Sequence, residues 1–425
     1  MYRRFQNERT VRAEFANSVL DTTNAYICNS RPRRFGKSYA ANMLAAYYSK
    51  GTDSEQMFSG LRISKDADFK KHLNKYDVIH IDIQWFLANC DDADKVVSFI
   101  TKSVLDELRG IYPDALPQEV VTLPDALSRV KERTGQKFVV IIDEWDVIIR
   151  DGAIIENIQD EYLNFLRGMF KGVEPTKYIQ LAYLTGILPI KKERAQSAVN
   201  NLDEFTMLQA DELAPYIGFT ENEVKGLCEK YNRDFDKVKK WYDGYLLDGY
   251  QVYNPKAVVS VMTKGRFRSY WSETGSYEVV IPLICMNYDG LKNAIIEMLS
   301  GSEVKVDTAT FKNDPAKIQN RDDVITYLIH LGYLGYNEDS ESAFVPNEEI
   351  RQELITAVRS SNWDELIAFQ QESRKLLTAT LSMDEKQVAA EIDKFHSQYA
   401  SMIQYNDENS LSSIITIAYL GAMQD

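Results

Sequence analysis

The sequence is poor in cysteine and histidine, with four of each in 425 residues. Cys28, Cys90, Cys228 and Cys285 lie 62, 138 and 57 residues apart and include no C-x-x-C pair. This spacing is typical neither of a disulfide framework nor of a zinc site. The four histidines form no cluster along the chain either, so the sequence offers no pattern of metal-binding side chains of this kind.

Long hydrophobic runs are also missing. No apolar run reaches the roughly 18 residues that a membrane span needs. The first ten residues, MYRRFQNERT, are polar and basic, which predicts no secretory signal. Apolar residues make up 44% and charged residues 26%, as in ordinary globular proteins. We therefore expect a soluble, cytoplasmic protein with no membrane partner, long enough for two or three domains.

Positive charge is scarce towards the C-terminus. The net charge is −14, and residues 301–425 contain 10 lysines and arginines against 21 aspartates and glutamates. Residues 1–300 contain 39 against 42. A chain this acidic is not expected to bind nucleic acid non-specifically over its whole surface, although local basic groups remain.

What the first half does contain is an alternation of apolar, β-branched runs with helical patterns. Strands are predicted at 25–29, 78–86, 137–146 and 178–186, and helices at 39–49, 95–109 and 160–171. Strands separated by helices predict βαβ units. The expected fold class is therefore α/β, with a parallel sheet covered by helices on both faces.

After about Pro215 the pattern becomes mainly helical. Thr220 is a predicted N-cap, with Glu223 completing a capping box. Residues 241–255, WYDGYLLDGYQVYNP, are interpreted as an irregular connector. Residues 322–347 predict a helix, a strand, an acidic turn and a second strand. That order suggests a winged-helix-like module within this α-helical region.

Residues 30–38, SRPRRFGKS, end like a phosphate-binding loop, but Arg31 stands where the pattern G-x-x-x-x-G-K-[ST] has its first glycine. Pro32 can stiffen the loop instead, so a site remains feasible if the backbone dihedral of Arg31 is ordinary. Gly36 allows close approach to phosphates, Lys37 would reach the β/γ oxygens, and the Ser38 hydroxyl would ligate Mg²⁺. The expected phosphate-binding residues are Arg33, Arg34, Phe35, Gly36, Lys37, Ser38 and Tyr39.

The second part of this hypothesis is the strand VVIIDE (Val139–Glu144). Its last residue lies 106 residues after Ser38. Asp143 is expected to hold Mg²⁺ through its water shell, and Glu144 to polarise the attacking water. The alternative is a buried strand that ends in surface acids. Because the loop and the strand both occur in the context that a nucleotide site requires, we favour the nucleotide site.

Three further interpretations complete the site. Thr185, at the end of the fourth predicted strand, is a candidate γ-phosphate sensor, with an ordinary strand-terminal turn as the equal alternative. Arg194 is the local candidate for an arginine finger, although a surface arginine is the commoner role. Residues 78–84, VIHIDIQ, are interpreted as the extra strand of the additional-strand P-loop class.

These motifs together resemble the bacterial AAA-ATPase-like proteins that usually carry a PD-(D/E)XK-type nuclease domain at their C-terminus. An arginine in place of the first loop glycine looks normal for that family, which favours a nucleotide site. The resemblance spans roughly residues 18–425 and implies an AAA-like ATPase domain at 1–214, a helical lid or connector at 215–300, a winged-helix-like helical domain at 301–400 and the first helix of a nuclease-like domain at 401–425. Its segments run in order: RPRRFGKS, MFSGLRIS, VIHIDIQ, VVIIDEWD, LTGILPIKKERAQSAVNNLDEFTML, IGFTENEV, WYDGYLLDGYQVYNP, YWSETGS, LGYLGY, VPNEEIR and YNDENSLSSII.

Two departures from the family pattern stand at the ends of the chain. The F-x-x-x-YVDKT-type segment that usually precedes the first strand is missing. The sequence stops at Asp425, directly after the helix that opens the nuclease fold in relatives, so the acid and the E-x-K triplet of a nuclease core are not there. We therefore expect no nuclease activity, whether from truncation or as a natural variant.

The leading functional hypothesis is a Mg²⁺-dependent ATPase, or GTPase, that acts as a motor or switch with ATP and Mg²⁺ as its cofactors. DNA, a nuclease supplied by another chain and a second copy of this chain are further partners that the resemblance implies. The alternative is a non-hydrolysing nucleotide-binding scaffold or a DNA-binding adaptor. The pair Asp143–Glu144 favours hydrolysis, and the net charge of −11 over residues 301–425 disfavours DNA binding there.

Overall fold

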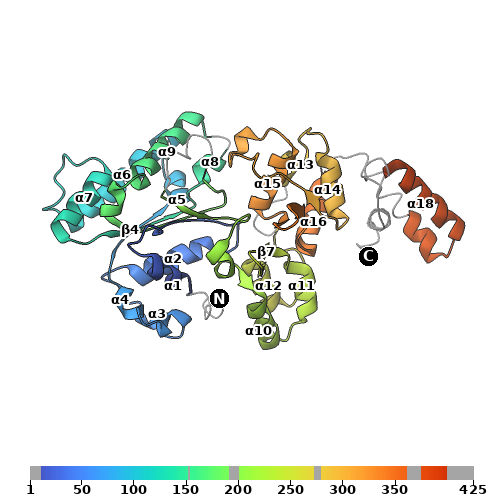
Figure 1. Ribbon diagram of the computed structural model, residues 1–425, viewed down its shortest axis with the longest axis horizontal. Helices are drawn as coiled ribbons and strands as arrows, with labels where there is room; N and C mark the ends of the chain where they lie inside the picture. Colours follow the sequence, from blue (N-terminus) through green and yellow to red (C-terminus); the bar gives the residue numbers. More distant parts are fainter. Residues whose placement is uncertain (1–10, 152–153, 191–200, 272–278, 361–374, 400–425) are drawn as a thin grey trace.

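The computed structural model describes residues 11–151, 154–190, 201–271, 279–360 and 375–399. Figure 1 shows a layered α/β part, formed by the N-terminal half, beside a mainly helical part that follows it in the chain. The predicted α/β fold class is thus confirmed. The described helices include none that is both long enough and apolar enough to cross a membrane.

The N-terminal part is built on a five-stranded sheet with the order β2-β3-β4-β1-β5, in which all neighbouring strands are parallel. Strands 25–29, 137–146 and 178–186 were predicted within a few residues of their bounds, whereas the short β5 was not predicted. The strands are β1 (Tyr26–Ser30), β2 (Asp77–Asp82), β3 (Phe138–Asp143), β4 (Ile179–Gly186) and β5 (Asp203–Phe205).

Helices cover both faces of this sheet because its central strands are apolar on both sides. Val139 and Ile141 of β3 pack with α2, whereas Val140 and Ile142 pack with α6, α7 and α9 on the opposite face (Figure 1). The helices are α1 (Val11–Val19), α2 (Lys37–Tyr48), α3 (Glu55–Phe58), α4 (Phe69–His72), α5 (Ile83–Ala88), α6 (Val96–Ile111), α7 (Leu123–Thr134), α8 (Val147–Arg150) and α9 (Glu156–Phe170).

Two expectations about β2 were wrong. The strand that separates β1 from β3 is β4, and β2 lies at the edge of the sheet, so residues 78–84 are not the inserted strand. The predicted strand 78–86 also ends early. The carboxylate of Asp82 accepts a hydrogen bond from the amide of Trp85 at 3.0 Å and caps α5, which turns Ile83–Ala88 into a helix.

The helical part contains two small antiparallel sheets, ordered β6-β8-β7 and β10-β11-β9. Its elements are β6 (Phe219–Thr220), α10 (Glu221–Tyr231), α11 (Phe235–Tyr242), β7 (Tyr245–Leu247), β8 (Tyr250–Tyr253), α12 (Pro255–Lys264), α13 (Val280–Ile284), α14 (Leu291–Leu299), β9 (Val304–Lys305), α15 (Arg321–Leu331), β10 (Gly335–Asn337), β11 (Ser342–Phe344), α16 (Glu348–Ser360) and α18 (Glu385–Tyr399).

Of the two local predictions for this part of the chain, one is confirmed and one was wrong. The capping box of Thr220 and Glu223 at α10 is confirmed. The interpretation of residues 241–255 as an irregular connector was wrong, because β7 and β8 form a hairpin around Asp248 and Gly249. Both turn residues have positive φ, 49° and 79°, as a tight Asp-Gly hairpin turn requires.

The predicted helix and two strands within 322–347 are present as α15, β10 and β11, with β9 completing their sheet. The core beneath them extends into the N-terminal part. Phe35 and Leu188 belong to the same buried hydrophobic cluster as Leu328 and Leu334. The four-way division of the chain stays a prediction, and the interpretation of 401–425 falls outside the described residues.

Candidate nucleotide-binding site

The loop between β1 and α2 joins a buried strand to a helix N-terminus at the carboxyl edge of the sheet. Its left-handed residues are Arg34, with φ 71°, and Gly36, with φ 87°, which is the N-cap of α2. The φ of Arg31 is not in the left-handed region, so its backbone is ordinary, as a nucleotide site with an arginine at this position requires. The first amides of α2 have no acceptor within the helix, which suits an anion.

Arg31 is a buried structural residue of this loop. Its guanidinium donates hydrogen bonds to the carbonyl oxygens of Ser30 at 2.9 Å and Thr206 at 2.8 Å. Burial lowers the pKa of Arg31 to about 10. The side chain therefore joins the end of β1 to the residue that follows β5 and does not face outwards to the phosphate position.

Lys37 is buried at the first position of α2, with 4% of its surface exposed. Its Nζ donates to the carbonyl oxygen of Pro32 at 3.2 Å and lies 3.9 Å from Oε1 of Glu144. Burial lowers the pKa of Lys37, and the Glu144 carboxylate partly opposes that shift. The lysine is thus held near the loop with a weak carboxylate partner.

Ser38 and Asp143 bring a hydroxyl and a carboxylate together beside the loop. Burial raises the pKa of Asp143 to about 6, and a hydrogen bond with the Ser38 side chain opposes the rise. Mg²⁺ commonly binds through one or two carboxylates together with substrate phosphates. The described residues contain no group of three His, Cys, Asp or Glu that could hold a metal ion. The Ser38 hydroxyl and the Asp143 carboxylate are oxygen ligands of the kind that Mg²⁺ takes alongside substrate phosphates.

Glu144 leaves β3 in a left-handed conformation, with φ 51°, and its side chain is about one-fifth exposed, at 19%. Oε2 of Glu144 lies 2.9 Å from Nη2 of Arg150. Nε of Arg150 in turn lies 2.6 Å from Oδ2 of Asp146. Glu144 thus has a cation on either side, Lys37 and Arg150.

Asp146 fixes this cluster to the end of β4. It is fully buried, and its Oδ2 accepts the amides of Ile187 at 3.1 Å and Leu188 at 2.8 Å. Gly186 leaves room for it, because an added Cβ would lie 2.5 Å from Oδ1 of Asp146. Burial lowers the pKa of Arg150, but the carboxylates of Asp146 and Glu144 outweigh this effect and leave the pKa raised.

The other predicted residues lie as follows. Thr185 pairs with Asp143 across β3 and β4, is fully buried, and donates its hydroxyl to the carbonyl oxygen of Asn29 at 3.0 Å. Arg33 is exposed, and Tyr39 is partly exposed in the first turn of α2. Arg194 lies outside the described residues.

Arg34 and Phe35 face the helical part of the molecule. Nη1 of Arg34 donates to the carbonyl oxygen of Tyr270 at 3.2 Å, and its guanidinium lies 5.4 Å from the centre of the Trp271 ring. The buried Phe35 ring packs edge-on against Tyr245, 5.2 Å between centroids. Both side chains therefore connect the loop with the helical part, and their amides are the groups left for phosphates.

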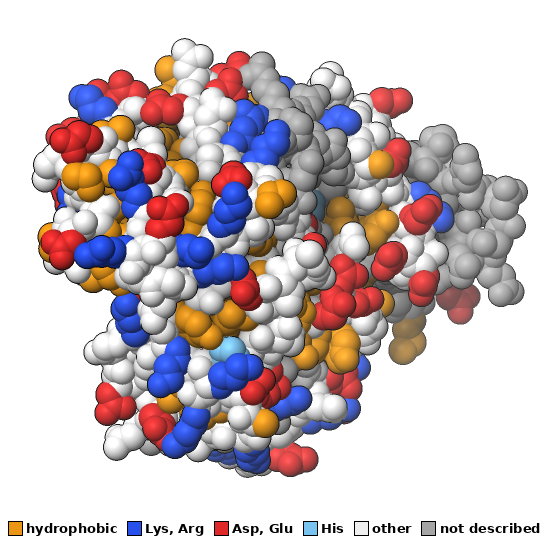
Figure 2. All heavy atoms as spheres, turned by 60° about the vertical axis from the view of Figure 1, so that its left-hand side comes forward, with side chains coloured by type: hydrophobic (Ala, Val, Ile, Leu, Met, Phe, Trp, Pro, Cys, Tyr) orange, Lys and Arg blue, Asp and Glu red, His pale blue; other side chains and the backbone are white. Residues whose placement is uncertain are grey.

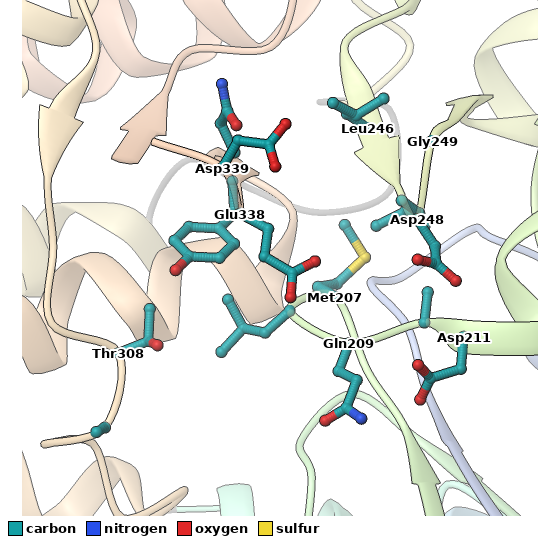
Figure 3. Close-up of a pocket in the computed structure, with 15 residues that line it drawn as sticks. Met207, Gln209, Asp211, Leu246, Asp248, Gly249, Thr308, Glu338 and Asp339 are labelled. Atoms are coloured by element: carbon teal, nitrogen blue, oxygen red, sulfur yellow. The ribbon is translucent and has the colours of Figure 1, made fainter. Parts of the chain in front are cut away.

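A separate cavity of about 610 Å³ lies where residues 207–211, the β7–β8 turn and the β10–β11 hairpin meet. Figure 3 shows carboxylates among its lining side chains, including Asp211, Asp248, Glu338 and Asp339. Four carboxylates repel a triphosphate. The phosphate-binding loop is therefore the better site for a nucleotide.

Asp146 and Arg150 were not among the residues predicted for the site. Both follow the VVIIDE strand directly, in DEWDVIIR, and their i, i+4 spacing is that of an ion pair on one helical turn. That spacing was a usable signal. The binding of Asp146 to the amides after β4 was not visible in it, because those residues are more than 40 positions away in the sequence.

Comparison with known families gives a match to the AAA-ATPase-like family, described as "Predicted AAA-ATPase", over residues 11–195. These residues contain β1 to β4, the loop, and the acids Asp143 and Glu144 at the end of β3. A curated relative, "Uncharacterized protein in vnfD 5′region" from Azotobacter chroococcum mcd 1, is 26% identical over 275 residues. The alignment covers 64% of this chain and 51% of that protein, so the chain spans about half of its relative.

Two solved structures are similar at 10% sequence identity. They are the Aeropyrum pernix ORC2 protein in ADPNP–ADP complexes, with a TM-score of 0.36, and Cdc6p from Pyrobaculum aerophilum, with a TM-score of 0.26. Each comparison covers 83% of this chain and 92% of the other. At this level of similarity neither carries an argument about what the chain binds.

Proposed function

We propose that this chain, whose residues 11–195 match the AAA-ATPase-like family, is a Mg²⁺-dependent P-loop ATPase. The observation that carries the proposal is the meeting of four side chains at the carboxyl edge of one parallel sheet. Lys37 and Ser38 come from the start of α2, and Asp143 and Glu144 from the end of β3. Open α/β sheets bind their ligands at this edge.

Each residue has a role that its position supports. The amides at the start of α2 would hold the phosphates, with Lys37 on the β/γ oxygens and Ser38 and Asp143 as the residues for Mg²⁺. Bound Mg²⁺ supplies charge neutralisation at the phosphate oxygens. Glu144 would accept a proton from the attacking water. Thr185 lies beside Asp143, but it is fully buried and donates its hydroxyl to Asn29, so its role as a γ-phosphate sensor stays a prediction.

The contacts of Arg34 and Phe35 support the idea of a switch. The phosphate-binding loop packs directly on the helical part, so a nucleotide that moves the loop would also move Tyr245, Tyr270 and Trp271. The winged-helix-like interpretation rests on the order of α15, β10 and β11. A role near DNA and a nuclease partner rest on the family resemblance alone.

The face of the molecule drawn in Figure 2 gives DNA binding little support. On the face in Figure 2, lysine and arginine side chains are interspersed with aspartates and glutamates and form no continuous basic stripe. Duplex DNA is bound chiefly through such stripes. The alternative is a non-hydrolysing nucleotide-binding scaffold.

ATP binding and phosphate release in Mg²⁺ test the proposal, with Lys37→Ala and Glu144→Gln as variants. We expect the wild type to bind and hydrolyse ATP, Lys37→Ala to lose binding, and Glu144→Gln to bind but turn over at least about 100-fold more slowly. Binding without turnover, with Glu144→Gln unchanged, would support the scaffold. The absence of any ATP binding would reject both.

A further inference from the structure

Arg150 is the residue with the strongest hold on Glu144. Its guanidinium bridges two carboxylates, with Nη2 2.9 Å from Glu144 and Nε 2.6 Å from Asp146. Its side chain is 10% exposed, so solvent screens these contacts little. The competing cation, Lys37, is 3.9 Å from the other oxygen of Glu144.

The two cations have different tasks in a nucleotide site. Lys37 must be available to the phosphates, and a strong ion pair with Glu144 would oppose that. Glu144 must point towards water, and a pair with Lys37 would draw it towards the phosphate-binding loop. A second cation in a fixed position, bound to the other oxygen of Glu144, leaves Lys37 available to the phosphates and keeps Glu144 from turning towards the loop.

Arg150 is fixed in this way because of Asp146. That carboxylate is buried and bound to the amides of Ile187 and Leu188. The planar guanidinium can bind Asp146 and Glu144 together through different nitrogens, which an ammonium group does less well. The end of β4 thereby sets the position of Glu144.

We infer that Arg150 is a positioning residue, which holds Glu144 away from Lys37 and in place for water. The inference rests on the proposed ATPase function and deepens it. It predicts that Arg150 affects nucleotide affinity and turnover through Glu144, rather than through general stability.

Nucleotide affinity in EDTA, measured with a fluorescent ATP analogue, tests the first half without any turnover. In Arg150→Ala, Glu144 is free to pair with Lys37, so we expect the affinity to fall by about three- to tenfold, as for a modest ion pair. The double variant Arg150→Ala/Glu144→Gln should regain the affinity of Glu144→Gln. Arg150→Gln is the second variant if the alanine variant does not fold.

Single-turnover hydrolysis with Mg²⁺ tests the second half. We expect Arg150→Ala to lower the rate by about 10- to 100-fold, and Arg150→Lys to recover part of it by keeping the charge. In the Glu144→Gln background, loss of Arg150 should cause no further decrease, because both residues act as one unit.

Arg129→Ala is the matched control, because Arg129 forms an i, i+4 pair with Asp125 at 2.8 Å on the exposed face of α7. It should change neither readout. Equal affinity and rate in Arg150→Ala and the wild type would overturn the inference. So would a loss that is as large in the Glu144→Gln background, which would show a structural role. If ATP binds but is not hydrolysed, the ATPase proposal fails, and the affinity series still decides whether Arg150 keeps Glu144 off Lys37.

Discussion

At the scale of single residues, the unusual loop is explained by where its left-handed residues fall. The turn uses Arg34 and Gly36, so the position of Arg31 needs no glycine. Its side chain is instead directed inwards, onto the carbonyl oxygens of Ser30 and Thr206. In place of the flexible backbone of a glycine, this position has a side chain that connects the end of β1 with the residue after β5.

Arg31→Gly, which restores the common loop pattern, should therefore destabilise the protein. It leaves two buried carbonyl oxygens without their donor, at a cost of about 1–3 kcal/mol. Urea denaturation measures the free energy of unfolding. The exposed neighbour is the control, and Arg33→Ala should change the value by less than about 0.5 kcal/mol. A more stable Arg31→Gly variant would contradict this connecting role of the side chain.

At the scale of elements, α16 is joined to the segment that holds Arg34. Glu349, in the first turn of α16, is buried and accepts the amides of Tyr270 at 2.6 Å and Trp271 at 3.1 Å. Burial raises the pKa of Glu349 to about 7, although the two amides and Arg34 oppose the rise. The carboxyl thus takes up a proton near neutral pH in the folded protein.

This shift predicts a pH-dependent stability. The ordinary pKa of the glutamate is 4.5 and the folded value is about 7, so the folded state binds the proton more tightly. Its contribution is full below pH 4.5 and is lost as the pH rises through 7. Between these values the free energy of unfolding should fall by up to about 1.4 kcal/mol per pH unit.

Urea denaturation across this range measures the slope, and Glu349→Gln should make it shallower. Part of the slope should remain, because burial also raises the pKa of Asp143, to about 6. Glu348→Gln, a change in the neighbouring acid of the same helical turn, should keep the wild-type slope. If Glu349→Gln and the wild type show the same dependence on pH, another group is responsible.

At the scale of the whole molecule, the helical part packs on the phosphate-binding loop. An added Cβ at Gly332, which follows α15, would lie 2.7 Å from Cβ of Pro32 and 3.1 Å from the ring of Trp271. The Tyr245 hydroxyl donates to the carbonyl oxygen of Gly332 at 2.7 Å, and the Tyr245 ring packs on Phe35. The two parts therefore share one interface beneath the loop.

Gly332→Ala should consequently weaken nucleotide binding from outside the site. The added methyl displaces Pro32, and we expect ATP affinity to fall by about tenfold, or about 1.4 kcal/mol. Gly135→Ala is the matched control, because Gly135 also caps a helix with positive φ, 75° against 82°, but has nothing within 4 Å of an added Cβ. Both should lose about 1–2 kcal/mol of stability from backbone strain. Equal ATP affinities would show that the interface does not affect the loop.

The sequence by itself determined most strands of the N-terminal part and which side chains meet at the edge of its sheet. Apolar β-branched runs indicate buried parallel strands, and the order of loop and acidic strand predicted which residues meet at the sheet edge. These signals are local, so they survive without knowledge of the fold. They failed where a side chain redirects the backbone, as Asp82 does at the end of β2, and where the Asp-Gly signal of the β7–β8 hairpin was overlooked.

Only the tertiary structure decided what surrounds the site. The strand order that places β4 between β1 and β3, the buried position of Arg31, and the linkage from β4 through Asp146 and Arg150 to Glu144 all join residues far apart in the chain. A sequence pattern specifies which side chains are present and how polar and apolar ones alternate. It does not specify which distant backbone groups a buried charge will find, because that depends on how the layers pack.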